Sequence, residues 1–174
     1  MDTPLAQMTM RGKWAEGIEP RHFHWIVTER LAISERPGGY GSQHRRVRRM
    51  EEIIWIKQHD FTWVISLIDA PHNLHNYDEQ SVPYRHWPVG AGDSVALDQA
   101  YRELRTMLES GNRLLLHHEE LGDKLCGFVA GYLMWSGLIE ESPRAIEVIE
   151  QITHRQLGPV GRELVAAAAR LGGD

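Results

Sequence analysis

The chain has 174 residues, of which 42% are hydrophobic and 25% charged, which is enough for one globular domain with a sizeable core. Its formal net charge of -5 argues against a protein that binds nucleic acid through phosphate contacts. The single cysteine excludes an internal disulfide and a cysteine-rich zinc site, and no apolar run reaches the ~18 residues of a membrane span. We therefore expect a cytoplasmic protein with no membrane role and no nucleic-acid partner.

The first part of the chain predicts a hairpin and a helix. Residues 1–20 show no clear period and are expected to be a poorly defined lead-in. Residues 23–27 and 31–34 are short and rich in β-branched and aromatic side chains, which predicts two edge strands or a hairpin. After the RPGGYG break, residues 43–58 place apolar side chains at helical spacing opposite a basic cluster. The apolar face comprises Val47, Met50, Ile53, Ile54 and Ile56, and the basic cluster comprises Arg45, Arg46, Arg48 and Arg49.

The remaining elements alternate between strands and helices. We expect strands at 62–68, 82–87 and 113–117, and helices at 73–80, 98–110, 125–136, 143–154 and 159–171. This alternation predicts an α/β fold with a mostly parallel central sheet flanked by helices. No internal repeat or linker-sized segment is present, so residues 1–174 are predicted to form one domain. Ligands in such sheets bind beyond the carboxyl ends of the strands, where residues 117–124 fall.

The stretch LLLHHEELGDKLCGFVAGYLMWSG, residues 114–137, is an apolar strand followed by a polar loop and an apolar helix. Together with the DAPHNLHNYDEQSVPYRHWPV segment upstream, it resembles the cysteine-dependent dual-specificity and protein tyrosine phosphatases over residues 31–156. In that family the strand ends in His-Cys-x5-Arg. The thiolate attacks phosphorus, the loop amides and the arginine hold the phosphoryl oxygens, and an upstream aspartate is the general acid.

The resemblance implies that His117 matches the motif histidine, while His118 stands at the nucleophile position and Lys124 at the arginine position. The chain thus looks like a pseudophosphatase, because the cysteine and the arginine are both absent from these positions. Lysine supplies a point charge where arginine supplies a bidentate fork, so phosphate should be held less well. The ligand-binding residues implied within the loop are His117, Glu119, Glu120, Leu121, Gly122, Asp123 and Lys124.

Two further positions depart from the family pattern. The usual loop glycine is Leu121 here, and Gly122 follows one place later, so the backbone position that tolerates a positive φ is shifted. In the acid loop Pro88 matches the family proline, but the position three beyond it is Ala91, and Asp93 is the nearest carboxylate. Asp93 is therefore the candidate general acid.

Several side chains near the loop have two interpretations. His118 either acts as a nucleophile or base, because neutral imidazole can be phosphorylated, or caps the helix that follows. Glu119 and Glu120 either face solvent, leaving the amides open to an anion, or fold inward and occupy the positive helix end themselves. Cys126 falls inside the predicted helix and is expected to be a small core group without catalytic function.

The basic residues Arg45 and Arg46 begin the predicted helix after the glycine-rich turn, and we expect them at the rim of the His118 pocket, binding an anion. The alternative is a solvated helix face that pairs with Glu51 and Glu52. The segment lacks the GxxxxGKT context of a nucleotide-binding loop, and the ten histidines show no zinc-binding spacing. We therefore predict no cofactor and no metal.

Three functions are compatible with this sequence. The favoured prediction is a phosphatase-like protein without cysteine-dependent catalysis that binds a phosphorylated or anionic ligand, or a protein partner, in a regulatory role. The alternative is a phosphohydrolase, acting on phosphoric monoesters, with His118 as nucleophile or base, Lys124 as phosphate ligand and Asp93 as acid. The third is a structural subunit in which the pocket is vestigial.

Overall fold

The structure is a computed structural model that describes residues 17–90 and 92–172, so most of the lead-in predicted at 1–20 lies outside the described residues. The strands are β1 (His24–Val27), β2 (Leu31–Glu35), β3 (Trp63–Ser66), β4 (Tyr84–His86) and β5 (Leu114–His118). The helices are the short 3-10 turn η1 (Gly41–Gln43), then α2 (Arg46–Gln58), α3 (His75–Glu79), α4 (Ser94–Glu109), α5 (Asp123–Trp135), α6 (Ser142–Thr153) and α7 (Pro159–Leu171).

The five strands form one mixed, mostly parallel sheet in the order β1-β2-β5-β3-β4. β1 and β2 make the predicted antiparallel hairpin, and the pairs β2–β5, β5–β3 and β3–β4 are parallel. Parallel neighbours need crossover connections, which the helices supply. The α/β fold with a mostly parallel sheet flanked by helices is therefore confirmed.

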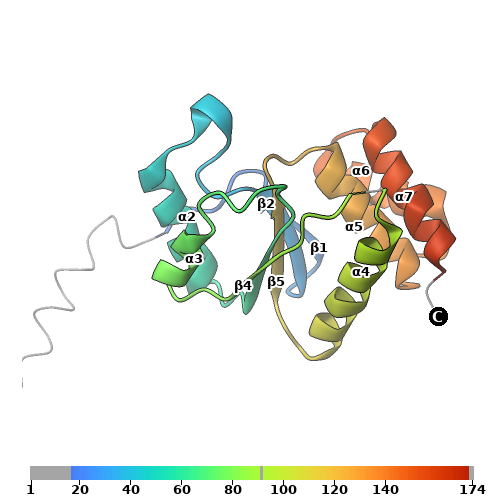
Figure 1. Ribbon diagram of the computed structural model, residues 1–174, viewed down its shortest axis with the longest axis horizontal. Helices are drawn as coiled ribbons and strands as arrows, with labels where there is room; N and C mark the ends of the chain where they lie inside the picture. The colour runs from blue at the N-terminus through green and yellow to red at the C-terminus, as the bar shows by residue number, and fades with distance from the viewer. Residues whose placement is uncertain (1–16, 91, 173–174) are drawn as a thin grey trace, which may run out of the picture.

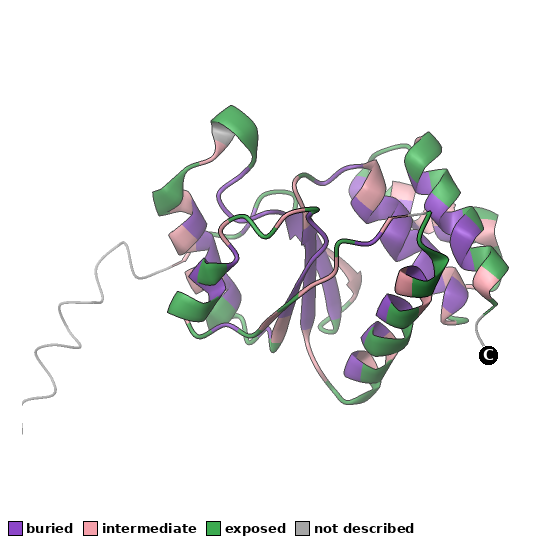
Figure 2. Cartoon of the chain, in the orientation of Figure 1, coloured by how far each residue is buried: buried purple, intermediate pink, exposed green. Residues whose placement is uncertain are grey.

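Helices cover both faces of the sheet (Figure 1): α2 and α3 lie on one side, and α4 to α7 on the other. Successive residues of a strand point to opposite faces. Thus Leu114 and Leu116 join the core under α4 to α7, whereas Leu115 joins the smaller core under α2 and α3. Figure 2 shows the central strands β2, β5 and β3 almost entirely buried, which is why their sequences are largely apolar.

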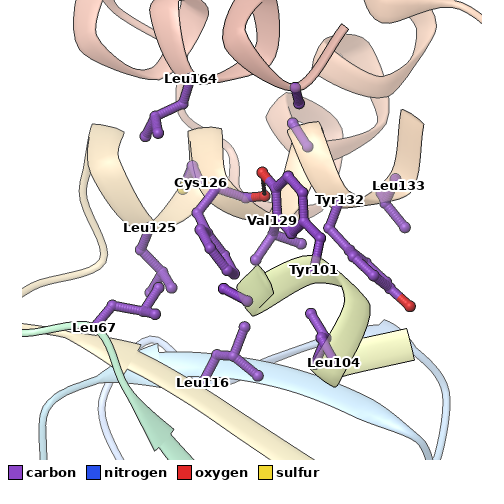
Figure 3. Packing of buried hydrophobic residues seen from close by; sticks show 14 of the residues in the cluster. Leu67, Tyr101, Leu104, Leu116, Leu125, Cys126, Val129, Tyr132, Leu133 and Leu164 are labelled. Atoms are coloured by element: carbon purple, nitrogen blue, oxygen red, sulfur yellow. Dashed lines mark hydrogen bonds between the residues drawn. The ribbon is translucent and has the colours of Figure 1, made fainter. Parts of the chain in front are cut away.

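Helix α5 is the centre of the larger core, between the sheet and α7 (Figure 3). Ten of its residues are buried, so it is apolar all round and not only along one stripe. Its closest approach to α7 is at Gly127, where an added Cβ would overlap the Cα of Gly161. The two helix backbones can meet here only because neither residue carries a side chain.

Two local predictions were wrong. In α2 the valine of the predicted apolar face, Val47, is 62% exposed, whereas Arg49 and Glu52 are buried. Glu52 is turned inward because its carboxylate accepts a hydrogen bond from the amide of Gly38, at 3.0 Å, and pairs with Arg48. Helix α4 begins at Ser94, earlier than expected, since the carboxylate of Asp93 caps it.

Among the helices of residues 17–90 and 92–172, none combines the length and the apolar character that crossing a membrane requires. The core that these helices build also contains the chain's single cysteine, Cys126, which is 3% exposed. Burial raises the pKa of its thiol to about 11. The prediction that Cys126 is a small core group is therefore confirmed, and its thiol stays protonated at neutral pH.

We expect Gly127→Ala to lower the free energy of unfolding by about 1–3 kcal/mol, because the new methyl group meets the α7 backbone and the helices must separate. Gly90→Ala is the matched control, since nothing lies within 4 Å of a Cβ added at Gly90. Urea unfolding of the three proteins checks this. Equal stability of the two variants would contradict the close packing of α5 against α7.

Candidate functional site

Three segments meet at the carboxyl edge of the sheet, because β2, β5 and β3 are adjacent and parallel. Ser34 pairs with His117, and His117 pairs with Ser66, so these three residues form one row across the sheet. The residues that follow each strand therefore leave the sheet side by side. The loops after β2, β3 and β5 carry Arg36, Asp69 and residues 119–122 respectively.

His117 points into the side of the sheet that α2 and α3 cover. Its side chain is almost fully buried, its Nε2 lies 3.1 Å from the hydroxyl of Tyr77, and its Nδ1 lies 3.4 Å from the carbonyl oxygen of His118. Burial lowers the pKa of His117 to about 3, so the ring is neutral at physiological pH. His117 therefore links β5 to α3, on the side opposite to α5.

His118 is only partly buried, but its Nε2 is inaccessible and has no hydrogen-bond partner among the described residues. Burial lowers the pKa of His118, and the nearby Lys124 lowers it further, while Asp69, Glu119 and Glu120 act in the opposite direction. The imidazole is thus predominantly neutral near pH 7. Its buried nitrogen faces no base that could orient or activate it.

Lys124, in the first turn of α5, forms an ion pair with Asp69, which follows β3; Nζ and Oδ1 are 2.8 Å apart. The hydrogen bond and the charge of Lys124 lower the pKa of Asp69. The Asp69 side chain is 78% exposed, so this pair is worth at most about 1 kcal/mol and is readily exchanged. Sequence reasoning missed Asp69, although its place just after a buried parallel strand was a usable signal.

The two loop glutamates, whose direction the sequence left open, are both held by the segment that follows β2. Glu119 turns inward and pairs with the buried guanidinium of Arg36, with Nη1 and Oε2 2.8 Å apart. The more exposed Glu120 accepts a hydrogen bond from the hydroxyl of Tyr40, and this raises the pKa of Tyr40. Arg36 is a second residue whose role the sequence pattern did not indicate, because its partner Glu119 lies 83 residues away in the sequence.

The loop keeps free hydrogen-bond donors. Within the part of the chain that the structure describes, no acceptor bonds the backbone amides of residues 119–122. These amides lead into the N-terminus of α5, where no side chain caps the helix. The first carboxylate of the helix, Asp123, turns away to cap α7, accepting hydrogen bonds from the amides of Gly158 and Gly161 at 2.6 and 2.7 Å. The result is a set of donors suited to an anion.

Two surface cavities border this loop. One, of about 300 Å³, is lined by Glu120 and Leu121 together with Tyr40 and Arg155. The other, of about 220 Å³, is lined by Gly122 and Asp123 and again by Arg155. Arg155, in the connection between α6 and α7, was not anticipated from the sequence. Neither cavity is lined by His118 or Lys124, and the His118 pocket that the sequence predicts stays a prediction.

The other residues that the sequence predicts for the site are Asp93, Arg45 and Arg46. Asp93, the candidate acid, accepts a hydrogen bond from the amide of Ala96 at 3.0 Å and so caps α4. The exposed guanidinium of Arg45 lies 3.5 Å from the carbonyl oxygens of Ser42 and His44, in its own turn. Arg46 is exposed. Among the described residues, no hydrogen bond or ion pair joins these arginines to residues 117–124, and their part in binding stays a prediction.

Comparison with known proteins identifies the fold. No protein-family model and no curated protein matches the chain in sequence. A crystal structure of kinase-associated phosphatase with its catalytic cysteine replaced by serine is similar, with a TM-score of 0.73 and 17% identity, covering 87% of this chain and 96% of that one.

Two human structures are similar as well. DUSP28 has a TM-score of 0.62 and 11% identity, with 89% of this chain and 98% of that chain covered. The tyrosine phosphatase-like serine/threonine/tyrosine-interacting protein has a TM-score of 0.59 and 14% identity, with 86% and 94% covered. The chain therefore has the fold of the dual-specificity and protein tyrosine phosphatases.

The buried neutral His117 predicts a pH dependence of stability. Its pKa is about 3 in the folded state and near 6.5 in the unfolded chain, so only the unfolded state gains this proton between those values. The contribution is fully present above pH 6.5 and declines as the pH falls, by up to about 1.4 kcal/mol per pH unit. His117→Gln should therefore lose stability less steeply than wild type between pH 6.5 and 4.

The measurement is urea unfolding at several pH values, and the control is His75→Gln, because the His75 side chain is 66% exposed. The free energy of unfolding of the His75→Gln control should fall with decreasing pH as steeply as that of wild type. A His117→Gln protein with that same slope would show that His117 is protonated in the folded state.

Proposed function

We propose that this protein is a pseudophosphatase: a phosphatase-fold protein without cysteine-dependent catalysis that binds a phosphorylated or anionic ligand, or a partner carrying one, in a regulatory role. The observation that carries the proposal is the position of the only cysteine. Cys126 lies in the core within α5, with its thiol pKa raised to about 11, so the loop has no thiolate. On the resemblance to the family, the nucleophile position is His118 and the arginine position is Lys124.

The loop retains what binding an anion requires. Unbonded amides at residues 119–122 and the uncapped start of α5 offer donors without a formal charge. Positive charge comes from Lys124, in the first turn of α5, and from Arg155, which lines both cavities beside residues 120–123. Asp69 competes for Lys124, and an incoming dianion would displace it at little cost because the pair is exposed.

Hydrolysis through His118 is not favoured by the same geometry. The Nε2 atom of His118 is inaccessible to solvent. Within residues 17–90 and 92–172, no carboxylate or carbonyl group accepts a hydrogen bond from it. The proposed acid, Asp93, is engaged as the cap of α4. A nucleophilic histidine is normally oriented by a partner on its second nitrogen. We therefore assign the loop a binding role.

Hydrolysis of a generic aryl phosphate by the wild-type protein should be undetectable. His118→Cys alone should restore little activity, because Lys124 stays at the position of the phosphate-binding arginine. The assay is steady-state release of the phenol, with an active phosphatase as positive control. Robust wild-type turnover that His118→Ala abolishes would contradict the proposal and establish the histidine mechanism.

Binding of inorganic phosphate or sulfate should respond in opposite directions to the two partners of the exposed ion pair. Lys124→Ala should weaken binding by about 10-fold or more, since a charged hydrogen bond is worth roughly 1.5–3 kcal/mol. Asp69→Asn should strengthen it by up to about 5-fold, since it frees the ammonium group. Calorimetric titration measures both, and the control is Arg144→Ala, because the Arg144 side chain on α6 is 57% exposed.

The double variant Arg45→Ala/Arg46→Ala extends the same titration. If these arginines reach the bound anion, affinity falls as it does for Lys124→Ala, and the loss shrinks at high salt. Affinity unchanged in the double variant would leave them as a solvated helix face. Equal affinity of wild type and Lys124→Ala would refute the loop as the anion site.

A further inference from the structure

A surface cavity lies at the end of α5 that is remote from the β5–α5 loop. Its volume is about 330 Å³, at the lower end of the range for small-molecule sites. Its walls come from the end of β1 and the residue before β2, from the last turns of α4 and from the last turn of α5 with the residues that follow. Because α5 starts at the loop and ends at this cavity, its 13 residues separate the two regions by about 20 Å.

Much of the cavity wall is apolar. Val27 and Leu108 are partly buried, and Leu138 at the rim is 60% exposed. A single exposed leucine needs no explanation, but this one lines the same hollow as two other apolar side chains. An apolar group that covers the three would release the water that they hold, which favours binding.

Tyr132 brings a hydrogen-bond donor to this wall. The residue is 2% exposed, and its side chain extends from α5 toward α4 (Figure 3). Burial raises the pKa of its hydroxyl to about 12, so the group is protonated at neutral pH. Among the described residues no side chain or backbone group hydrogen-bonds this hydroxyl, and its oxygen remains accessible. An acceptor on a ligand can therefore take its proton in a hydrogen bond.

Two guanidinium groups and one carboxylate set the charge of the cavity. Arg30 is exposed, and one of its terminal nitrogens donates to the carbonyl oxygen of Leu108, which holds the guanidinium at the end of α4. Arg105 lowers the pKa of Tyr132 and Glu109 raises it, so both charges lie near the hydroxyl. With two positive groups against one negative group in the wall, the cavity favours an anion.

We propose that this cavity binds a small amphipathic carboxylate, a molecule with an aromatic or branched aliphatic body and one carboxylate group. The body covers the apolar side chains of Val27, Leu108 and Leu138. The carboxylate accepts hydrogen bonds from the Arg30 guanidinium and the Tyr132 hydroxyl, beside the positive charge of Arg105. Planar guanidinium and carboxylate groups match in geometry, and their hydrogen bonds are stronger than neutral ones.

This site is independent of the loop proposed above to bind a phosphorylated or anionic ligand. Neither His118 nor Lys124 lines the cavity, and inorganic phosphate, which lacks an apolar body, gains nothing from its apolar wall. A result that refutes one site therefore leaves the other untouched.

The first test is calorimetric titration of the full chain with 4-phenylbutyrate, with 4-phenylbutanol as the neutral analogue and 4-phenylbutylamine as the cationic one, at constant ionic strength. The acid should bind at least about 5-fold more tightly than the alcohol, because only the acid forms charged hydrogen bonds. Saturating inorganic phosphate should leave the affinity for the acid unchanged. Equal affinity for the acid and the alcohol, or tighter binding of the amine, would overturn the proposal.

Variants of the cavity wall sharpen this test. Arg30→Met and Tyr132→Phe should each weaken binding of the acid by about 5-fold or more and leave binding of the alcohol unchanged. Glu109→Gln should strengthen binding of the acid by about 2-fold, because it removes the opposing charge. Arg144→Ala on α6, whose side chain is 57% exposed, is the control and should bind the acid as wild type does.

The location of the bound acid is measured separately, from the backbone amide shifts of the isotope-labelled protein during the same titration. Shifts should gather at residues 27–30, 108–109 and 136–138, and shifts confined to residues 118–124 would place the acid at the loop and refute the site. If Arg30→Met does not fold, Tyr132→Phe decides, since it removes only the hydroxyl. Unchanged affinity of Tyr132→Phe for the acid would then overturn the proposal.

Discussion

The parallel pairing of β2, β5 and β3 is the constraint on which the candidate site depends. It places Ser34, His117 and Ser66 in one row, so the chain leaves all three strands at the same edge and at the same level. Each pairing is fixed by backbone hydrogen bonds and by burial of both faces, so a slip of one residue would turn the core side chains of β5 to the wrong side. Within β5, His117 and His118 point to opposite faces of the sheet, because successive residues of a strand alternate between its two faces.

Charged groups at that edge are neutralised mainly by the segment that follows β2. Arg36 pairs with Glu119. Arg48 pairs with both Glu35 and Glu52, and these three side chains form a largely buried network. Burial raises the pKa of Glu52, and the hydrogen bonds from Arg48 and from the amide of Gly38 offset part of that shift. Such networks stabilise a fold only when every charge finds a partner. The buried Nη1 of Arg48 and Nε of Arg49 have no hydrogen-bond partner among the described residues, so these two arginines are not fully satisfied.

The β5–α5 loop combines backbone amides that bond no acceptor among the described residues with side chains that are already engaged. Asp123 caps α7, Lys124 pairs with Asp69, and the glutamates are held by Arg36 and Tyr40. Within residues 17–90 and 92–172, the amides of residues 119–122 are the donors of this loop that no acceptor bonds, and an amide cannot act as a nucleophile. These contacts are the basis of our proposal that the loop binds a ligand and does not hydrolyse it.

The sequence by itself determined the fold class, most element positions and the burial of Cys126, because these depend on local periodicity and on the apolar character of central strands. It also located the loop between β5 and α5, since parallel strands end at a common edge. Only the tertiary structure decided the roles of Arg36, Asp69, Arg49 and Arg155, and the directions of Glu119 and Glu120. Arg36 and Glu119 lie 83 residues apart in the sequence, and Lys124 and Asp69 lie 55 apart, and local sequence pattern carries no information on such pairings. For the same reason, an amphipathic pattern could not show that Arg49 is buried while Val47 is exposed.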